Sequence, residues 1–207
     1  MKKEQQVEKV YQKLSQIEHI LKRPDTYVGS IEKTEANLWV KPDNLDRFEL
    51  RKFEYIPGLY KIFDEIIVNA ADNYQRDNSM NLVKANIDRN TSEISVFNNG
   101  KSIPIVIHKE HNIYIPEMIF GHLLTGSNFN DEEKKVTGGR NGFGAKLTNI
   151  FSTKFVVETA DQKTGKKFKM TWGKNMSQKS EPEIKDYNGT SYTKITFIPD
   201  LKRFTRI

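Results

Sequence analysis

A glycine-rich stretch, residues 138–149 (here the glycine loop), combines the groups best suited to hold an anion. Four glycines fall within seven residues there, and a segment that favours a helix follows directly. Glycine lets backbone N–H groups approach a bound anion closely, and a helix start adds unpaired N–H donors. Arg140 and Lys146 place positive charge at the two edges. The glycine loop therefore predicts a phosphate site, with a flexible surface loop as the alternative.

The glycine loop does not fit the common phosphate-binding motifs. Gly139 and Gly144 have the spacing of a Walker A loop, but Ala145 stands where that motif requires lysine. A dinucleotide-binding G-x-G-x-x-G that begins at Gly142 fails because Leu147 takes the place of the last glycine. The H-R-D and D-F-G motifs of protein kinases do not occur in the sequence. We therefore expect a nucleotide loop of another class.

A predicted helix over residues 60–73, after the helix-breaking Pro57-Gly58 pair, has an unusual polar side. At about 100° per residue, the side chains expected on that side are Glu65, Asn69, Asp72, Asn73 and Arg76. The side chains expected to face the core are Phe63, Ile67, Ala70, Ala71 and Tyr74. Asparagine is a poor helix former, so two of them in one helix suggest a chemical task.

These polar side chains suit work on a phosphate. A carboxamide oxygen is a hard ligand for Mg²⁺, and its NH₂ group can donate a hydrogen bond to phosphate. Glu65, one turn before Asn69, could orient and deprotonate a water molecule. A solvated face with incidental asparagines is the alternative. A third motif is the expected strand at residues 94–97, which ends in Asn98-Asn99-Gly100; taken alone, it predicts only a strand end.

In this order, the Glu/Asn helix, the strand ending in N-N-G-x-x-I-P and the glycine loop resemble the GHKL ATPase superfamily. That superfamily includes DNA gyrase, the ninety-kilodalton heat-shock chaperone, histidine kinases and MutL proteins, which share the Bergerat nucleotide fold. Within it, the chain resembles eukaryotic-type DNA topoisomerase II over nearly its whole length. The segments that carry this closer resemblance are E-H-I-L-K-R-P-D-T-Y-V-G-S at 18–30, P-G-L-Y-K-I-F-D-E at 57–65 and K-V-T-G-G-R-N-G at 135–142. Asn98, where gyrase-like relatives have Asp, also resembles this branch.

The resemblance implies a role for each site residue. Glu65 would be the general base, Asn69 the Mg²⁺ ligand that also touches the phosphates, and Asn73 a neighbour of the nucleotide. Asn98 would bind the adenine amino group, helped by Thr193 through water. The ribose and phosphate contacts would come from Gly126, Ser127 and Asn128. The loop over the triphosphate would consist of Gly139, Arg140, Asn141, Gly142, Phe143, Gly144, Ala145 and Lys146. Tyr11 would reach the nucleotide of a partner subunit.

Three residues depart from the pattern of the family. Ser102 takes the place of the second glycine in N-N-G-x-G-I-P, so the turn must accommodate a β-carbon. Phe143 replaces a common tyrosine, and Gly126 replaces a common serine, so that only its backbone can contribute. None of these changes removes a group that the resemblance makes catalytic.

Composition sets limits on the function. With 207 residues the chain can form one sizeable core, and without cysteine it has no disulfide, thiolate metal site or cysteine nucleophile. The polar N-terminus does not read as a secretory signal, and no apolar run is long enough for a membrane span. The net charge of +6 is compatible with DNA, but the scattered lysines are typical of a solvated face.

The pattern of elements predicts an α/β (α+β) two-layer sandwich, with helices on one face of a mixed, largely antiparallel sheet. We expect an arm or helix at 7–23, short strands within 27–55, and helices at 58–77, 116–123 and 142–151. Further strands are expected at 83–88, 93–98, 154–160, 166–173 and 191–198, with a hairpin turn at 161–166 and a loop at 175–189. We expect residues 1–27 to be an N-terminal strap and residues 28–207 the ATPase domain.

The resemblance also implies properties of a longer protein. The transducer and DNA-cleavage domains would lie outside this sequence, so this chain alone should bind ATP or ADP, hydrolyse ATP weakly or not at all, and not cut DNA. In the whole enzyme it would be an ATP-operated gate that closes as a homodimer, drives DNA strand passage and works in the nucleus. A GHKL chaperone or MutL-like clamp that acts on protein partners is the alternative function.

Overall fold

A computed structural model describes residues 13–125 and 142–204 of the chain. Its helices are α2 (Gln16–Lys22), α3 (Pro24–Tyr27), α4 (Pro57–Arg76), α5 (Ile115–Gly121) and α6 (Gly144–Ile150), with a 3-10 turn, η1 (Leu201–Arg203). Its strands are β1 (Thr34–Val40), β2 (Glu49–Tyr55), β3 (Val83–Asp88), β4 (Glu93–Asn99), β5 (Ser152–Asp161), β6 (Lys166–Gly173), β7 (Gln178–Lys179), β8 (Glu183–Asp186) and β9 (Tyr192–Pro199).

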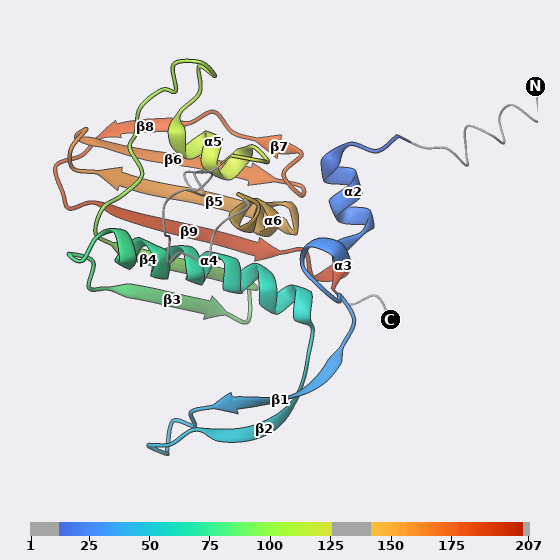
Figure 1. The fold of residues 1–207 in the computed structure, drawn as a ribbon. Helices are drawn as coiled ribbons and strands as arrows, with labels where there is room; N and C mark the ends of the chain where they lie inside the picture. The colour runs from blue at the N-terminus through green and yellow to red at the C-terminus, as the bar shows by residue number, and fades with distance from the viewer. Residues whose placement is uncertain (1–12, 126–141, 205–207) are drawn as a thin grey trace, which may run out of the picture.

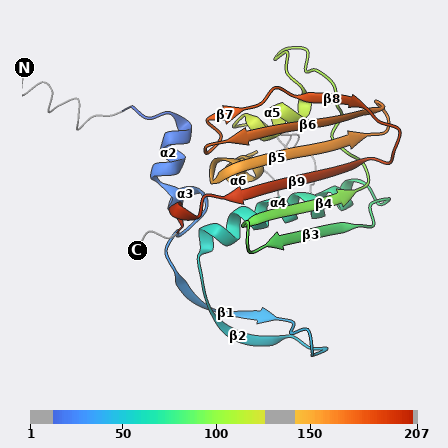
Figure 2. The ribbon, with the colours of Figure 1, turned by 180° about the vertical axis from the view of Figure 1, so that it is seen from behind.

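Seven strands form the main sheet. Their order is β3-β4-β9-β5-β6-β7, with β8 also paired to β6, and each of these neighbours runs antiparallel to the next. Helices α4, α5 and α6 lie over one face of the sheet, whereas the view from behind shows that no described helix covers the other (Figures 1 and 2). The predicted two-layer sandwich is therefore confirmed.

The core lies between these helices and the sheet. Directly opposed residues of neighbouring strands point to the same face. One row of such residues consists of Ile94, Phe197, Phe155 and Trp172. The next row consists of Val96, Ile195, Val157 and Met170. All of these side chains belong to the hydrophobic core cluster or pack against it, so the alternating strand pattern fixes which face the helices cover.

The N-terminal elements lie at one end of this body. Ser15 caps α2 with a capping box, in which its hydroxyl accepts from the backbone of Glu18 and the Glu18 carboxylate accepts from the backbone of Ser15. Ile20 of α2 is fully buried in the core cluster. Strands β1 and β2 pair only with each other, and their hairpin projects away from the main sheet (Figure 1). No helix in the described parts of the chain is long and apolar enough to cross a membrane.

Most predicted elements appear within a few residues of their expected bounds, but two expectations were wrong. The connection at 175–189 is not a plain loop, because it contains β7 and β8, which extend the sheet edge beside β6. The expected core stripe of α4 was wrong in part. Of its residues, Ala70 is buried and Phe63 and Ile67 pack against the core, but Ala71 and Tyr74 are exposed, and the other buried hydrophobic residues are Ile62 and Ile66. The buried stripe thus lies nearer to Glu65, Asn69 and Asn73 than the sequence suggested.

Candidate nucleotide-binding site

Helix α4 supplies the first part of the site. Pro57 occupies its first turn, where its missing N–H group costs nothing, and the N–H of Gly58 donates to the carbonyl of Ser30. Along the helix, Glu65 and Asn73 are half-buried, and Asn69 is exposed. The polar side chains therefore lie at the border of the helix face that packs on the core, rather than on its fully solvated side.

Glu65 is held by an ion pair with Lys61. The Lys61 Nζ lies 2.7 Å from Glu65 Oε1 and 3.1 Å from Asp64 Oδ2. The hydrogen bond to Glu65 is the largest of the causes that raise the pKa of Lys61 above its ordinary value. Lys61 therefore stays charged at neutral pH and holds the Glu65 carboxylate through its Oε1 atom.

The other carboxylate oxygen of Glu65 lies against the start of α6. A β-carbon built on Gly144 would overlap Glu65 Oε2, so only glycine allows this approach. Thr148 of α6 also donates its hydroxyl proton to the Ile62 carbonyl of α4, at 2.8 Å. Contact between α4 and α6 therefore places the predicted general base beside the end of the glycine loop. Two of the three sequence motifs meet here.

Lys146 is the one charged residue of α6. It is buried, and its Nζ donates to the Thr125 carbonyl. Burial lowers the pKa of Lys146 from 10.5 to about 8. Ala145 is also buried, whereas Phe143 is half-buried and its ring contacts that of Tyr27 at 6.3 Å between centroids. A desolvated ammonium with one carbonyl partner would gain from an anion beside it.

The second end of the site is a polar row on the helix-covered face of the sheet. Asn98 of β4 lies directly opposite Thr193 of β9, which lies opposite Thr159 of β5. The Thr159 and Thr193 hydroxyl oxygens are 3.1 Å apart. The buried Asn98 donates its amide NH₂ to the Asn99 carbonyl at 3.0 Å. This arrangement leaves the Asn98 carboxamide oxygen to accept a proton from a ligand, such as an exocyclic amino group.

Met80 connects this row to α4. Its Sδ accepts a hydrogen bond from the NH₂ of Asn73 at 3.5 Å and a weaker one from that of Asn98 at 4.0 Å. The segment that follows α4 is itself tied to the end of β4, because Asn99 Oδ1 accepts from the backbone of Asn81 and Leu82. The structure thus brings Asn73 and Asn98 together, although the sequence places them 25 residues apart.

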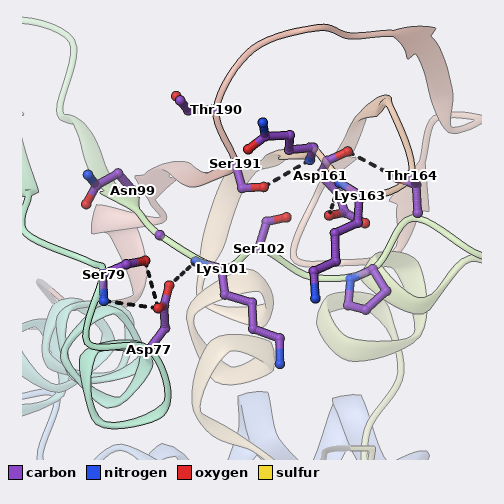
Figure 3. A pocket seen from close by; sticks show the side chains of 13 residues that line it. Asp77, Ser79, Asn99, Lys101, Ser102, Asp161, Lys163, Thr164, Thr190 and Ser191 are labelled. Carbon is purple, nitrogen blue, oxygen red and sulfur yellow. Dashed lines mark hydrogen bonds between the residues drawn. The ribbon is translucent and has the colours of Figure 1, made fainter.

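A cavity of about 930 Å³ continues from the polar row. Gly100 directly follows β4, Ser191 directly precedes β9 and Asp161 is the last residue of β5, and all three line this cavity. Its wall also carries Lys101, whose backbone N–H donates to Asp77, and Ser102 (Figure 3). Most of the residues that line the cavity have hydroxyl, carboxamide or charged side chains.

Ser102 is the one departure from the family pattern that the structure places in this cavity wall. Figure 3 shows it between Ser191 and Asp161. The residue is buried, and its hydroxyl oxygen has no hydrogen-bond partner among the described residues. The turn therefore accepts the β-carbon but leaves a polar atom unsatisfied.

Several predicted contacts cannot be placed in this way. Tyr11, Gly126, Ser127, Asn128, Gly139, Arg140 and Asn141 lie outside the described residues. Of the predicted residues that are described, Glu65 and Gly144 meet at one end, and Asn73, Asn98 and Thr193 meet at the other. Sequence reasoning missed Lys61 and Met80. The i, i+4 spacing of Lys61 and Glu65 could have revealed the ion pair, but no sequence signal marks Met80.

Comparison with known proteins agrees with this geometry. Residues 54–202 match the family described as histidine kinase-, DNA gyrase B-, and HSP90-like ATPase. The chain belongs to this ATPase family. DNA topoisomerase 2 of Drosophila melanogaster is 60% identical over 198 residues, which are 96% of this chain but 14% of that protein. The chain therefore spans only a small part of the length of such relatives.

Solved structures of this ATPase family give the same result. The ATPase region of Saccharomyces cerevisiae topoisomerase II has a TM-score of 0.93 and 57% identity, over 96% of this chain and 53% of that chain. The 43K ATPase domain of Thermus thermophilus gyrase B, in complex with an aminocoumarin, has a TM-score of 0.64 at 20% identity over 92% of this chain and 41% of that chain, which shows the fold alone. These matches confirm the resemblance and the assignment as an ATP-binding ATPase domain of the topoisomerase II type.

Proposed function

We propose that this domain is the ATP-operated gate of a type II DNA topoisomerase, in which ATP binding and hydrolysis drive DNA strand passage by the longer protein. The observation that carries the proposal is the meeting of the three motifs. Glu65 lies against Gly144 of the glycine loop, and Met80 joins Asn73 to Asn98. This gives the site a carboxylate and a buried ammonium at one end and a base-reading carboxamide at the other.

The phosphate end suits hydrolysis by a general base. Glu65 would take a proton from water as the water oxygen forms a bond to the γ-phosphorus and the bond from that phosphorus to the bridging oxygen breaks, which gives ADP and phosphate. Lys61 holds the carboxylate through its Oε1 atom. The Glu65 Oε2 atom, beside Gly144, is the oxygen that Lys61 does not occupy. We therefore assign proton transfer to Oε2.

The residues present also fit a magnesium ion. Asn69 is exposed, lies one helical turn beyond Glu65 and offers a carboxamide oxygen, which is the hard donor that Mg²⁺ prefers. When bound, Mg²⁺ would neutralise charge on the triphosphate. Asn69 would hold the ion through that oxygen and donate a hydrogen bond from its NH₂ group to a phosphate oxygen. Lys146 would leave its Thr125 partner and pair with a phosphate oxygen, which restores a full charge partner to a buried ammonium.

The base end suits adenine. The Asn98 NH₂ group is engaged with the Asn99 carbonyl, so its Oδ1 favours a ligand that donates, as the adenine amino group does. Thr193 lies directly across from Asn98 and would add a contact through water. A guanine base would present a carbonyl oxygen to the Asn98 oxygen, and the two acceptors would repel. The arrangement therefore favours ATP over GTP.

The whole-protein part of the proposal extends beyond this domain. Residues 1–27 would act as a strap, with Tyr11 reaching the nucleotide of a second subunit, and residues 28–207 as the ATPase domain. The ring contact between Tyr27 and Phe143 joins the described end of the strap to the end of the glycine loop. Closure of the loop on ATP would therefore act on the strap and favour a homodimer. The DNA contacts would come mainly from the rest of the enzyme, which would work in the nucleus.

The test of this proposal is a calorimetric titration of the chain with a non-hydrolysable ATP analogue and Mg²⁺. We expect one site per chain, weaker binding of the GTP analogue, and weaker ATP binding after Asn98→Ala. Thr196→Val, on the opposite face of β9, is the matched control and should leave binding unchanged. If neither nucleotide gives heat or a thermal shift at millimolar concentration, the proposal is wrong.

A further inference from the structure

A short loop between β4 and α5, remote in sequence from every predicted nucleotide contact, gathers three metal-binding side chains. Residues 108–112 lie in the loop between Ile107 and Tyr114, and these two residues pair in an isolated antiparallel β-bridge. The N–H of His108 donates to the Ile113 carbonyl, and the N–H of Asn112 donates to the His108 carbonyl, each at 2.8 Å. The N–H of Ile115 also donates to the Val106 carbonyl, at 2.9 Å. The backbone of this loop is therefore fixed before any ligand binds.

The side chains of His108, Glu110 and His111 converge on the outside of this loop. The two imidazole rings are stacked, with centroids 4.7 Å apart and planes at 27°. One ligand atom from each of the three side chains lies within 4.8 Å of the other two. His108 is half-buried, whereas Glu110 and His111 are exposed and free to adjust their rotamers. His108 is thus the most fixed of the three side chains, and Glu110 and His111 can rotate to coordinate an ion.

The chemistry of this set selects a class of ion. Neutral imidazole is a borderline donor that suits zinc and neighbouring transition ions, whereas Mg²⁺ and Ca²⁺ require oxygen ligands. Bonds of about 2.0–2.2 Å in a tetrahedral site place ligand atoms roughly 3.3 Å apart. The present separations are within reach of that value through side-chain rotation alone. The bond from the Glu110 N–H to His108 Nδ1 is long, at 3.3 Å, and ligation through Nδ1 would replace it.

We propose that His108, Glu110 and His111 bind one zinc ion, or a similar divalent transition ion, with the remaining position open to water. The loop leads into the N-terminal end of α5 and lies at the top of the molecule in Figure 1. Because none of its ligands belongs to the predicted nucleotide site, binding should not depend on ATP. The ion would cross-link three side chains of the loop and so stabilise the segment that precedes α5.

The composition of the chain makes the test clean. It has no cysteine and four histidines, two of which are in this loop. Isothermal titration with ZnCl₂, in millimolar Mg²⁺, should give one site per chain. His111→Ala should weaken zinc binding at least tenfold, and the isosteric Glu110→Gln should weaken it by a smaller factor. His19→Gln, at a histidine on α2 outside the loop, is the matched control and should leave binding unchanged.

Cobalt absorbance and thermal shift complete the experiment. Co²⁺ should give visible bands typical of nitrogen and oxygen ligands, and these should disappear in His111→Ala. Zinc should raise the melting temperature of the wild-type chain but not that of His111→Ala. Because Glu110→Gln preserves side-chain shape, it keeps the test valid should a histidine variant misfold. Zinc binding that survives His111→Ala and Glu110→Gln, or that is lost in His19→Gln, would overturn the proposal.

Discussion

The two ends of the candidate site are built in different ways. The base end stands on three neighbouring strands, and its Asn98–Thr193–Thr159 row is fixed by backbone register and joined to α4 through Met80. The phosphate end is formed by two helices. Its charged groups have partners that a nucleotide could replace: Lys61 pairs with Glu65, and Lys146 donates to the Thr125 carbonyl. A rigid end can select the base, whereas an end with exchangeable partners can respond to phosphate.

The largest effect should come from the general base. Glu65→Gln keeps the shape of the side chain but removes the proton acceptor. In the full-length enzyme, we expect ATP turnover to fall by roughly 10²-fold or more, while ATP-analogue binding survives. The measurements are steady-state hydrolysis and calorimetry.

Asp64→Asn is the matched control for Glu65→Gln, because Asp64 also contacts Lys61 but lies away from Gly144. It should leave turnover within a small factor of the wild type. Equal losses in the two variants would show that the effect comes from disturbing Lys61. Unchanged turnover in Glu65→Gln would show that another group is the general base. It would also contradict the assignment of catalysis to the phosphate end of the site.

The next effect concerns Lys146. A phosphate partner favours the charged form of Lys146. ATP affinity should therefore be highest below about pH 8, which is the pKa of Lys146 in the domain without nucleotide, and should fall as the pH rises through that value. Lys146→Met should weaken binding by roughly 10- to 100-fold and flatten the pH dependence. Calorimetry between pH 7 and pH 9 measures both, with the exposed Lys194→Met as the control.

The folding stability of the domain without nucleotide should rise with pH, whereas its ATP affinity should fall. The pKa of Lys146 is about 8 in the folded chain, against an ordinary value of 10.5 for an exposed lysine. Between these values the unfolded chain keeps the proton and the folded chain loses it, so the contribution of Lys146 to stability rises with pH. Melting curves without nucleotide should show this rise in the wild type relative to Lys146→Met. A constant difference between the two proteins would contradict the buried-ammonium interpretation.

A smaller effect should separate metal binding from phosphate binding. Asn69→Ala removes one hard oxygen ligand, so the affinity for the ATP analogue should fall roughly tenfold in Mg²⁺ and change little in EDTA. Gln75→Ala, exposed on the same helix, is the control. Equal losses with and without metal would show that Asn69 supports the fold rather than the ion.

The sequence predicted local features of this site better than their juxtaposition. Alternation over residues 94–97 located β4, and the Asn/Glu pattern marked the side of α4 on which Glu65 meets Gly144. The buried side of α4 was harder to predict, because Ile62, Ile66 and Ala70 bury against α6 and the sheet, while apolar Tyr74 stays exposed. Tertiary contacts decided which apolar residues were covered, and no local pattern carries that information.

The same limit applies to the contacts that join the motifs. The contact of Glu65 with Gly144 and the link through Met80 depend on how α4 packs against α6 and against the end of β4. Residues far apart in the chain meet there, so spacing could not predict them. The short strands β7 and β8 were missed for a similar reason. They contain few apolar residues and exist because β6 offers an edge for pairing.

The smallest effect should come from two serines in the wall of the same cavity, beside the rigid base end. Ser102 has a buried hydroxyl without a partner among the described residues, whereas the Ser191 hydroxyl accepts from the Gln162 N–H at 2.9 Å. Removing an unsatisfied hydroxyl relieves a desolvation cost, and removing a bonded one orphans its partner. Ser102→Ala should therefore stabilise the domain by about 1 kcal/mol, and Ser191→Ala should destabilise it by about 1 kcal/mol. Urea unfolding of the two variants measures both. A loss of stability in Ser102→Ala would mean that water from the adjoining cavity bonds this hydroxyl in solution, so that solvent reaches the wall beside the base end as far as Ser102.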